Sequence, residues 1–152
     1  MAQNVKLLEG LQAIVTGLSQ QADGHALLSR IFASEGFGKL AEKYAEHAAE
    51  ERSYVEKIAD RILDLGGELK NEAKAASPLC KSPAEWVKKD LQISRDGLAY
   101  LKTIIDCAGD DLTTYDILKD YYKDEEEDMY WGEQQLDLIE CIGLQNWLAK
   151  QM

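Results

Sequence analysis

Two glutamates of this 152-residue chain, Glu51 and Glu125, stand at positions where the helical pattern places buried side chains. Each is followed three residues later by another potential oxygen donor: Tyr54 follows Glu51, and Asp128 follows Glu125. Residues three apart on a helix share one face, so each pair could reach a single ion. Carboxylates inside a helix bundle commonly bind iron or manganese. The four residues are therefore candidate metal ligands.

The two histidines of the chain, His25 and His47, fall on the same inward-facing stripes and would add imidazole nitrogen to the site. Burying two carboxylates side by side costs on the order of several kcal/mol each unless a cation or a proton compensates. Three arrangements meet that requirement. They are a bound metal ion, a proton shared by Glu51 and Glu125, and pairing of a glutamate with His25 or His47.

Each candidate also has an interpretation that involves no metal. Tyr54 could be a core tyrosine whose hydroxyl is hydrogen-bonded, and His25 could be a hydrogen-bonded core histidine. An error of one residue in the helical phase would move Glu51 or Glu125 to the surface. The sequence leaves these alternatives open.

The elements that must position these residues are helices. Apolar residues recur at steps of three and four through most of the chain. Ser82–Glu85 reads SPAE, a capping box with proline at the first helical position, and Gly66–Gly67 ends the helix before it. The predicted helices cover residues 4–33, 39–65, 82–108 and 110–141, and a short fifth helix follows Gly143.

Inward-facing polar residues cluster near the midpoints of all four long predicted helices. They are Gln21, His25, His47, Glu51, Tyr54, Ser94, Glu125 and Asp128.

The lengths of the connections predict the topology. Only a few residues join the first helix to the second and the third to the fourth, so each pair forms an antiparallel hairpin. Residues 66–82 span ~56 Å when extended at ~3.3 Å per residue, whereas a helix of ~27 residues is ~40 Å long. This crossover can travel the length of the bundle and make the second and third helices parallel. The predicted fold class is all-α, a ferritin-like four-helix bundle with one long crossover and a short C-terminal helix.

The composition of the chain limits the classes of partner and site that it can have. Acidic residues outnumber basic ones 28 to 17, and a formal net charge of -11 disfavours nucleic acid and anionic membranes as partners. The three cysteines lack C-x-x-C spacing and predict neither a disulfide framework nor a zinc site. No secretory signal or membrane-length apolar stretch is recognisable. We expect one domain over residues 1–152, located in the cytoplasm.

The chain resembles the bacterioferritin family from its first helix to its end. EQQLDLIECIGLQNWL (133–148) looks like that family's closing segment, ADRILDLGG (59–67) looks like the end of its second helix, and Asp96-Gly97 matches a common pair in its third. The resemblance implies iron storage in a cage of subunits, 24 in that family, and we expect a homo-oligomeric cage of 24 or 12 subunits. It also implies a di-iron ferroxidase centre that oxidises Fe(II).

The ligand pattern implied by the resemblance is only partly present. The family uses one glutamate on the first and third helices and Glu-x-x-His on the second and fourth. Glu51 and Glu125 match the two Glu-x-x-His glutamates, but Tyr54 and Asp128 replace the histidines, and Leu18 and Ser94 replace the other two glutamates. In addition, Arg52 stands where the family has its haem-ligating methionine, so haem is not expected.

Two functions follow as hypotheses. The first is an iron-binding protein that forms a homo-oligomeric cage and holds metal at a reduced site of Glu51, Glu125, Asp128 and His25, whereas His47 could alternatively line the cage cavity. Whether such a site oxidises iron is left open. The second is an inactive structural subunit that forms a shell or co-assembles with an active ferritin subunit.

Overall fold

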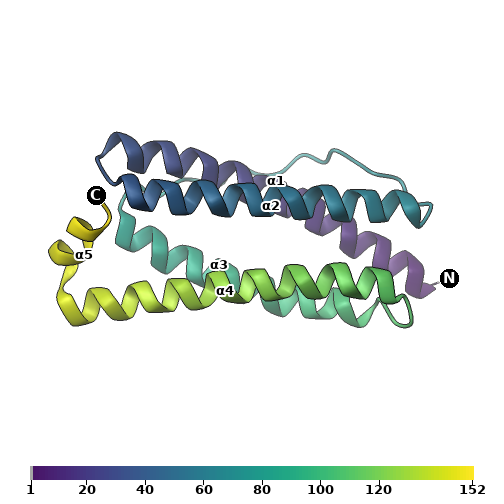
Figure 1. Cartoon of the computed structure of the whole chain (residues 1–152). Coiled ribbons are helices and arrows are strands. Elements are labelled where there is room, and N and C mark those ends of the chain that lie inside the picture. The colour runs from purple at the N-terminus through teal and green to yellow at the C-terminus, as the bar shows by residue number, and fades with distance from the viewer. Residues whose placement is uncertain (1) are drawn as a thin grey trace.

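The computed structural model describes residues 2–152 as a bundle of four long helices, built from two antiparallel hairpins, with a short fifth helix at one end (Figure 1). The elements are α1 (Ala2–Ser34), α2 (Gly38–Asp64), α3 (Pro83–Asp106), α4 (Leu112–Ile142) and α5 (Leu144–Lys150). Each boundary lies within two residues of the predicted one, and no strand occurs among the described residues. The predicted all-α bundle with a short fifth helix is confirmed.

The long connection carries the chain back to the end of the bundle where α2 begins, as its length predicts. Figure 1 shows the segment between α2 and α3 running back along the whole bundle, so that α2 and α3 point the same way. Three side chains spaced by one turn on α1 fasten this segment. Gln12 bonds both backbone groups of Lys70, at 2.9 and 3.0 Å, Thr16 reaches Glu72, and Gln20 donates to the backbone carbonyl of residue 75.

The start of α3 differs in one detail from the predicted capping box. Pro83 occupies the first helical position and Ser82 is the N-cap residue, but the Ser82 side chain makes no capping hydrogen bond. The backbone carbonyl of Ser82 instead accepts from the Trp86 amide at 2.9 Å. At the start of α4, Asp111 is the N-cap residue, and its carboxylate accepts from the Thr114 amide at 3.1 Å.

Two apolar cores fill the bundle, one toward each end. One includes Leu11, Ile58, Ile104 and Leu118. The other includes Phe32, Leu40, Tyr44, Val87 and Trp147.

Helix α5 covers the end of the bundle that holds the second core. Trp147 is fully buried and donates from Nε1 to Gln135 at 2.9 Å. The backbone carbonyl of Gln151 accepts from the Lys39 amide, which ties the chain end to the start of α2. Across the described part of the chain, none of the helices has the length and apolar character needed to cross a membrane.

Candidate metal centre

A layer of polar side chains lies in the middle of the bundle and draws on all four long helices. Its buried members are His25 from α1, His47 and Glu51 from α2, Asp90 and Ser94 from α3, and Glu125 from α4. Asp128 of α4 lies at its edge, with its side chain 20% exposed. The layer therefore contains five of the six predicted ligands and one acidic residue that was not predicted.

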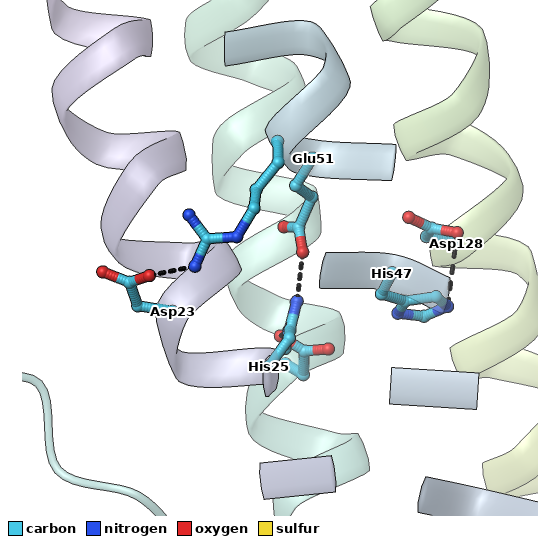
Figure 2. A network of polar contacts seen from close by, with 7 residues as sticks. Asp23, His25, His47, Glu51 and Asp128 are labelled. Atoms are coloured by element: carbon cyan, nitrogen blue, oxygen red, sulfur yellow. Dashed lines mark hydrogen bonds and ion pairs between the residues drawn. The ribbon is translucent and has the colours of Figure 1, made fainter. Parts of the chain in front are cut away.

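The centre of the layer is a chain of two carboxylates joined by one imidazole. His25 Nδ1 lies 2.5 Å from Glu51 Oε1 (Figure 2). His25 Nε2 lies 3.0 Å from Asp90 Oδ1. Burial by itself lowers the pKa of His25, but the hydrogen bonds to Asp90 and Glu51 outweigh burial and raise it to about 10. The imidazole is therefore a cation that links α1, α2 and α3.

The second oxygen of Glu51 is left free. Gln21 approaches this carboxylate, but Oε2 is buried and has no hydrogen-bond partner among the described residues. Burial raises the pKa of Glu51, and the contact with His25 opposes that rise. An unpaired buried carboxylate oxygen is costly. It marks a position where a cation or a donor would be stabilising.

Two further carboxyl groups from α4 approach Glu51. Burial and then the charge of Glu51 raise the pKa of Glu125 to about 7, with the Ser94 hydroxyl opposing the change. Burial and then Glu125 raise the pKa of Asp128 to about 8. These groups are hard to ionise because they are buried and lie near other carboxylates.

His47 lies on the α4 side of the layer. The residue is 3% exposed in the subunit, which does not fit the alternative that His47 lines the cage cavity. Its Nε2 lies 3.5 Å from Asp128 Oδ1 (Figure 2) and makes no hydrogen bond within the described chain. Burial, followed by the charges of His25 and Lys43, lowers the pKa of His47 to about 3. A neutral imidazole with a free nitrogen is available to bind a metal.

Tyr54 is the one predicted ligand that the structure does not bring into the layer. Its hydroxyl donates to Asp124 Oδ2 at 2.5 Å, and its ring packs on Tyr121 with centroids 5.2 Å apart. Tyr54 belongs to the apolar core that includes Leu11 and Ile58. Its hydroxyl is thus engaged away from Glu51.

Asp90 is the residue that sequence reasoning missed. It lies one turn before Ser94 on α3 and has a buried side chain that contacts His25. A signal was present in the pattern, because Ser94 was predicted to face inward and residue 90 lies one turn before it on the same face of the helix. An aspartate on that face could have been recognised as a partner for a buried histidine.

The side chains do not enclose an ion in the arrangement described. Within residues 2–152, no three His, Cys, Asp or Glu side chains come close enough together to hold a metal. The donor chemistry nevertheless fits one hard or borderline ion, since Glu51 Oε2 and His47 Nε2 are buried and unpartnered. Glu51, His47, Glu125 and Asp128 would have to move inward to bind it.

The residues present do not fit haem at the position implied by the resemblance. Arg52 occupies that position, about half exposed, and forms an ion pair with Asp23 across α1 and α2. A guanidinium offers no lone pair to haem iron.

A cavity of about 440 Å³ reaches the polar layer from the outside, between α1, the crossover and α3. His25 and Asp90 line it together with Trp86, and Gly17 and Gly24 form its α1 wall. Small solutes could therefore approach the polar layer through this cavity, from the side that His25 lines.

Comparison with known proteins places the chain in a family. The model of the ferritin family, described as a ferritin-like domain, matches residues 8–142. A bacterial ferritin of Pseudomonas aeruginosa is 34% identical over 150 residues, covering 97% of both chains. One from Neisseria meningitidis is 32% identical over the whole of both chains. A bacterioferritin of Mycolicibacterium paratuberculosis is 29% identical over 95% of this chain and 89% of its own. The chain belongs to the ferritin-like family, with bacterial ferritins and bacterioferritins among its relatives.

Proposed function

We propose that this protein binds and stores iron as a subunit of an oligomeric, bacterioferritin-like cage, and that its intrasubunit metal site is altered. The observation that carries the proposal is the excess of buried carboxyl groups over cations in the polar layer. Glu51, Asp90, Glu125 and Asp128 face one imidazolium, that of His25.

The charge imbalance is large enough to matter. An uncompensated buried charge costs on the order of several kcal/mol even after relaxation. His25 offsets part of the charge of Glu51 and Asp90, but no cation among the described residues is in contact with Glu125 or Asp128. A divalent cation bound by Glu51, Glu125, Asp128 and His47 would supply the missing positive charge. Oxygen-rich sites with one imidazole suit Fe(II).

The chemistry that iron would bring is one-electron oxidation of Fe(II) to Fe(III) by an oxidant such as dioxygen. The protein's contribution is to bind the ion, orient the carboxylates and limit water at the site. Because the ligand set is altered, the proposed function is binding of iron, and the oxidation of Fe(II) is measured alongside it.

Assembly into a cage is the second part of the proposal. It is supported by the names of the relatives and by large apolar side chains exposed on the single subunit. These include Leu112 at 75%, Val5 at 56% and Leu27 at 56% exposure. Burial of such side chains against neighbouring subunits would be stabilising. A cytoplasmic location is proposed with it, where the free cysteines Cys80, Cys107 and Cys141 would stay reduced.

One observation favours a second function, that of a structural subunit. His25 already fills the space between Glu51 and Asp90 with a built-in cation. Leu18 is a buried apolar residue where the family resemblance implied a glutamate, and Ser94 replaces another. A subunit of this kind would form the shell alone or with an active ferritin subunit and would bind no iron in its own bundle.

The experiment that separates the two functions is anaerobic Fe(II) titration of the metal-free protein, followed by admission of air. Iron binding and Fe(III) formation are compared with those of a Glu51→Gln/Glu125→Gln variant. Glu126→Gln/Glu127→Gln is the matched control, because these carboxylates are neighbours of Glu125 but lie farther out on α4. Iron bound per subunit that is lost only in the first variant supports the storage function. Equal binding in all three proteins leaves the structural role.

A further inference from the structure

We propose that the cavity between α1, the crossover and α3 binds a small carboxylate with an elongated apolar body, such as a straight-chain fatty acid in its anionic form. The cavity has a volume of about 440 Å³, and small-molecule sites in proteins have volumes of ~300–1,000 Å³. The inference goes beyond iron storage and does not depend on it, because the anion binds at the end of the cavity that lies away from the polar layer.

The cavity exists because two glycines leave α1 without side chains where it faces the crossover and α3. Gly17 and Gly24 are about two turns apart, and both line the cavity. A Cβ at Gly24 would meet only Leu79 Cδ2 within 4 Å, at 3.8 Å. Gly10, a further two turns earlier, shows the contrast, because Ile104 packs directly against it. The gap is therefore a slot that runs along α1 for at least ~10 Å, at ~1.5 Å per residue.

The side chains opposite Gly24 make the slot largely apolar. Leu79 of the crossover and Trp86 and Ile93 of α3 line it. Ile93 remains 37% exposed in the subunit although it is a large apolar side chain. An apolar chain in the slot would cover these groups and remove them from water, which is favourable. The body of the ligand is therefore apolar.

Lys74 supplies the positive charge that selects an anion. The ionisable side chains that line the cavity are Asp23, His25, Lys74 and Asp90. Asp23 is paired with Arg52 and Asp90 with His25, whereas Lys74 forms no ion pair within residues 2–152. Its ammonium nitrogen would lie 4.0 Å from a Cβ at Gly17, which places it at the Gly17 end of the slot. A carboxylate at that end would complete the pair.

The Gly17 end is also the end at which the carboxylates of the polar layer repel an anion least. Asp90 contacts His25, and His25 lies ~12 Å beyond Gly17 on α1 at ~1.5 Å per residue. With its carboxylate beside Lys74, the ligand directs an apolar tail and not a second charge toward Asp90. A monocarboxylate fits this distribution of charge, whereas an organic cation does not.

The test is isothermal titration calorimetry of the assembled, metal-free protein with octanoate. Octanol and octylamine serve as neutral and cationic ligands with the same apolar body. We expect one octanoate to bind per subunit, roughly 5-fold more tightly than octanol, because the ion pair with Lys74 is partly exposed. Octylamine should bind more weakly than both.

Lys74→Met tests the charge, since methionine keeps much of the apolar stem and loses the ammonium group. Its affinity for octanoate should fall to that for octanol, and its affinity for octanol should not change. Lys81→Met is the matched control, because Lys81 is an exposed lysine that precedes α3 and does not line the cavity. It should bind all three ligands as the parent protein does.

Gly24→Leu tests the location by placing a side chain in the slot. Gly24 lies inside α1, and its Cβ would be at an ordinary contact distance from Leu79. Octanoate and octanol should both bind at least roughly 10-fold more weakly to this variant, because the new side chain occupies their space. Gly97→Leu is the matched control, because Gly97 lies inside α3, outside the cavity, with open space around its Cβ. It should leave both affinities unchanged.

The melting temperature of each variant is measured in parallel. Undiminished binding by a folded Gly24→Leu variant would place the ligand elsewhere and overturn the inference. If that variant does not fold, Lys74→Met decides, and undiminished octanoate binding there would overturn the inference. Equal affinities for octanoate and octanol, or tighter binding of octylamine, would overturn the carboxylate as the ligand. Absence of saturable octanoate binding would overturn the site. Each of these results leaves the Fe(II) titration unaffected, so failure of this inference is distinguishable from failure of iron storage.

Discussion

His25 Nδ1 and Glu51 Oε1 lie 2.5 Å apart in the interior of the bundle, and each side chain is only 4% exposed. The same two helices are also joined on the outside by the ion pair of Arg52 and Asp23, whose side chains are 52% and 62% exposed. One structure thus contains a buried and an exposed charged contact between α1 and α2. Because one contact is buried and the other is exposed, their contributions to the free energy of unfolding should differ greatly.

Replacement of His25 by leucine should destabilise the metal-free protein by about 3–5 kcal/mol, because it leaves Glu51 and Asp90 buried without a cation. Arg52→Ala should cost less than about 1 kcal/mol, since exposed pairs are screened by water and salt. Urea unfolding of both variants in the presence of a chelator measures the two values. Similar losses for the two variants would contradict the buried, charged state assigned to His25.

The stability of the metal-free protein should fall as the pH rises through neutrality. The carboxyl group of Glu125 has an ordinary pKa of 4.5 and a raised pKa of about 7 in the folded protein. Because the folded value is the higher one, the contribution of Glu125 to stability is fully present below pH 4.5 and is lost as the pH rises to 7. A tenfold change in proton affinity is worth ~1.4 kcal/mol, so this loss is at most about 3.5 kcal/mol.

Glu125→Gln provides the measurement for this pH dependence. Glutamine cannot ionise, so the variant should gain stability relative to the parent protein as the pH rises from 4.5 to 7, and the difference should level off above pH 7. Guanidinium unfolding at several pH values gives the difference directly. Glu127→Gln, an exposed neighbour, should show no comparable trend, and a trend of equal size there would argue against burial of Glu125 as the cause.

Much of the fold follows from the sequence, because helix ends depend on local glycine, proline and polar signals. Gly66 and Pro83 mark the ends of the crossover as predicted. The existence of the polar layer was also predictable, since the position of a residue along its helix fixes its height in the bundle. What the pattern left open was the partner of Glu51. A metal, a shared proton and a histidine all satisfy the same spacing, and the choice depends on side-chain rotamers that no periodicity encodes.

Two glycines of α1 should respond in opposite ways to alanine. A Cβ at Gly10 would lie 2.9 Å from both Ile104 Cγ1 and Cγ2, whereas a Cβ at Gly24 would meet only Leu79 Cδ2 at 3.8 Å. Ile104 is buried and β-branched, so it adjusts poorly. Gly10→Ala should lose about 1–2 kcal/mol of unfolding free energy through overpacking. Gly24→Ala should gain about 0.5–1 kcal/mol through helix propensity, and urea unfolding of the pair tests both signs.

Gln12 should control the local stability of the crossover. Its amide accepts from the Lys70 backbone N–H at 2.9 Å and donates to the Lys70 carbonyl at 3.0 Å, so one side chain satisfies both backbone groups. Gln12→Ala should cost about 1–2 kcal/mol, because each lost hydrogen bond is worth ~1 kcal/mol. Since α1 itself remains packed, the loss should appear as faster hydrogen exchange of the Lys70 amide.

Thr16→Ala is the comparison for Gln12, one turn further along α1. Its hydroxyl donates to the exposed side chain of Glu72 at 2.9 Å and accepts from Gln12 Nε2 at 3.0 Å. Both contacts are to side chains and not to the backbone of Lys70, so their loss should leave the exchange of the Lys70 amide nearly unchanged. If Gln12→Ala did not accelerate the hydrogen exchange of the Lys70 amide, the crossover would be held by other contacts and not by that of Gln12. Faster exchange confined to the crossover would identify Gln12 as the side chain that fastens it along the bundle.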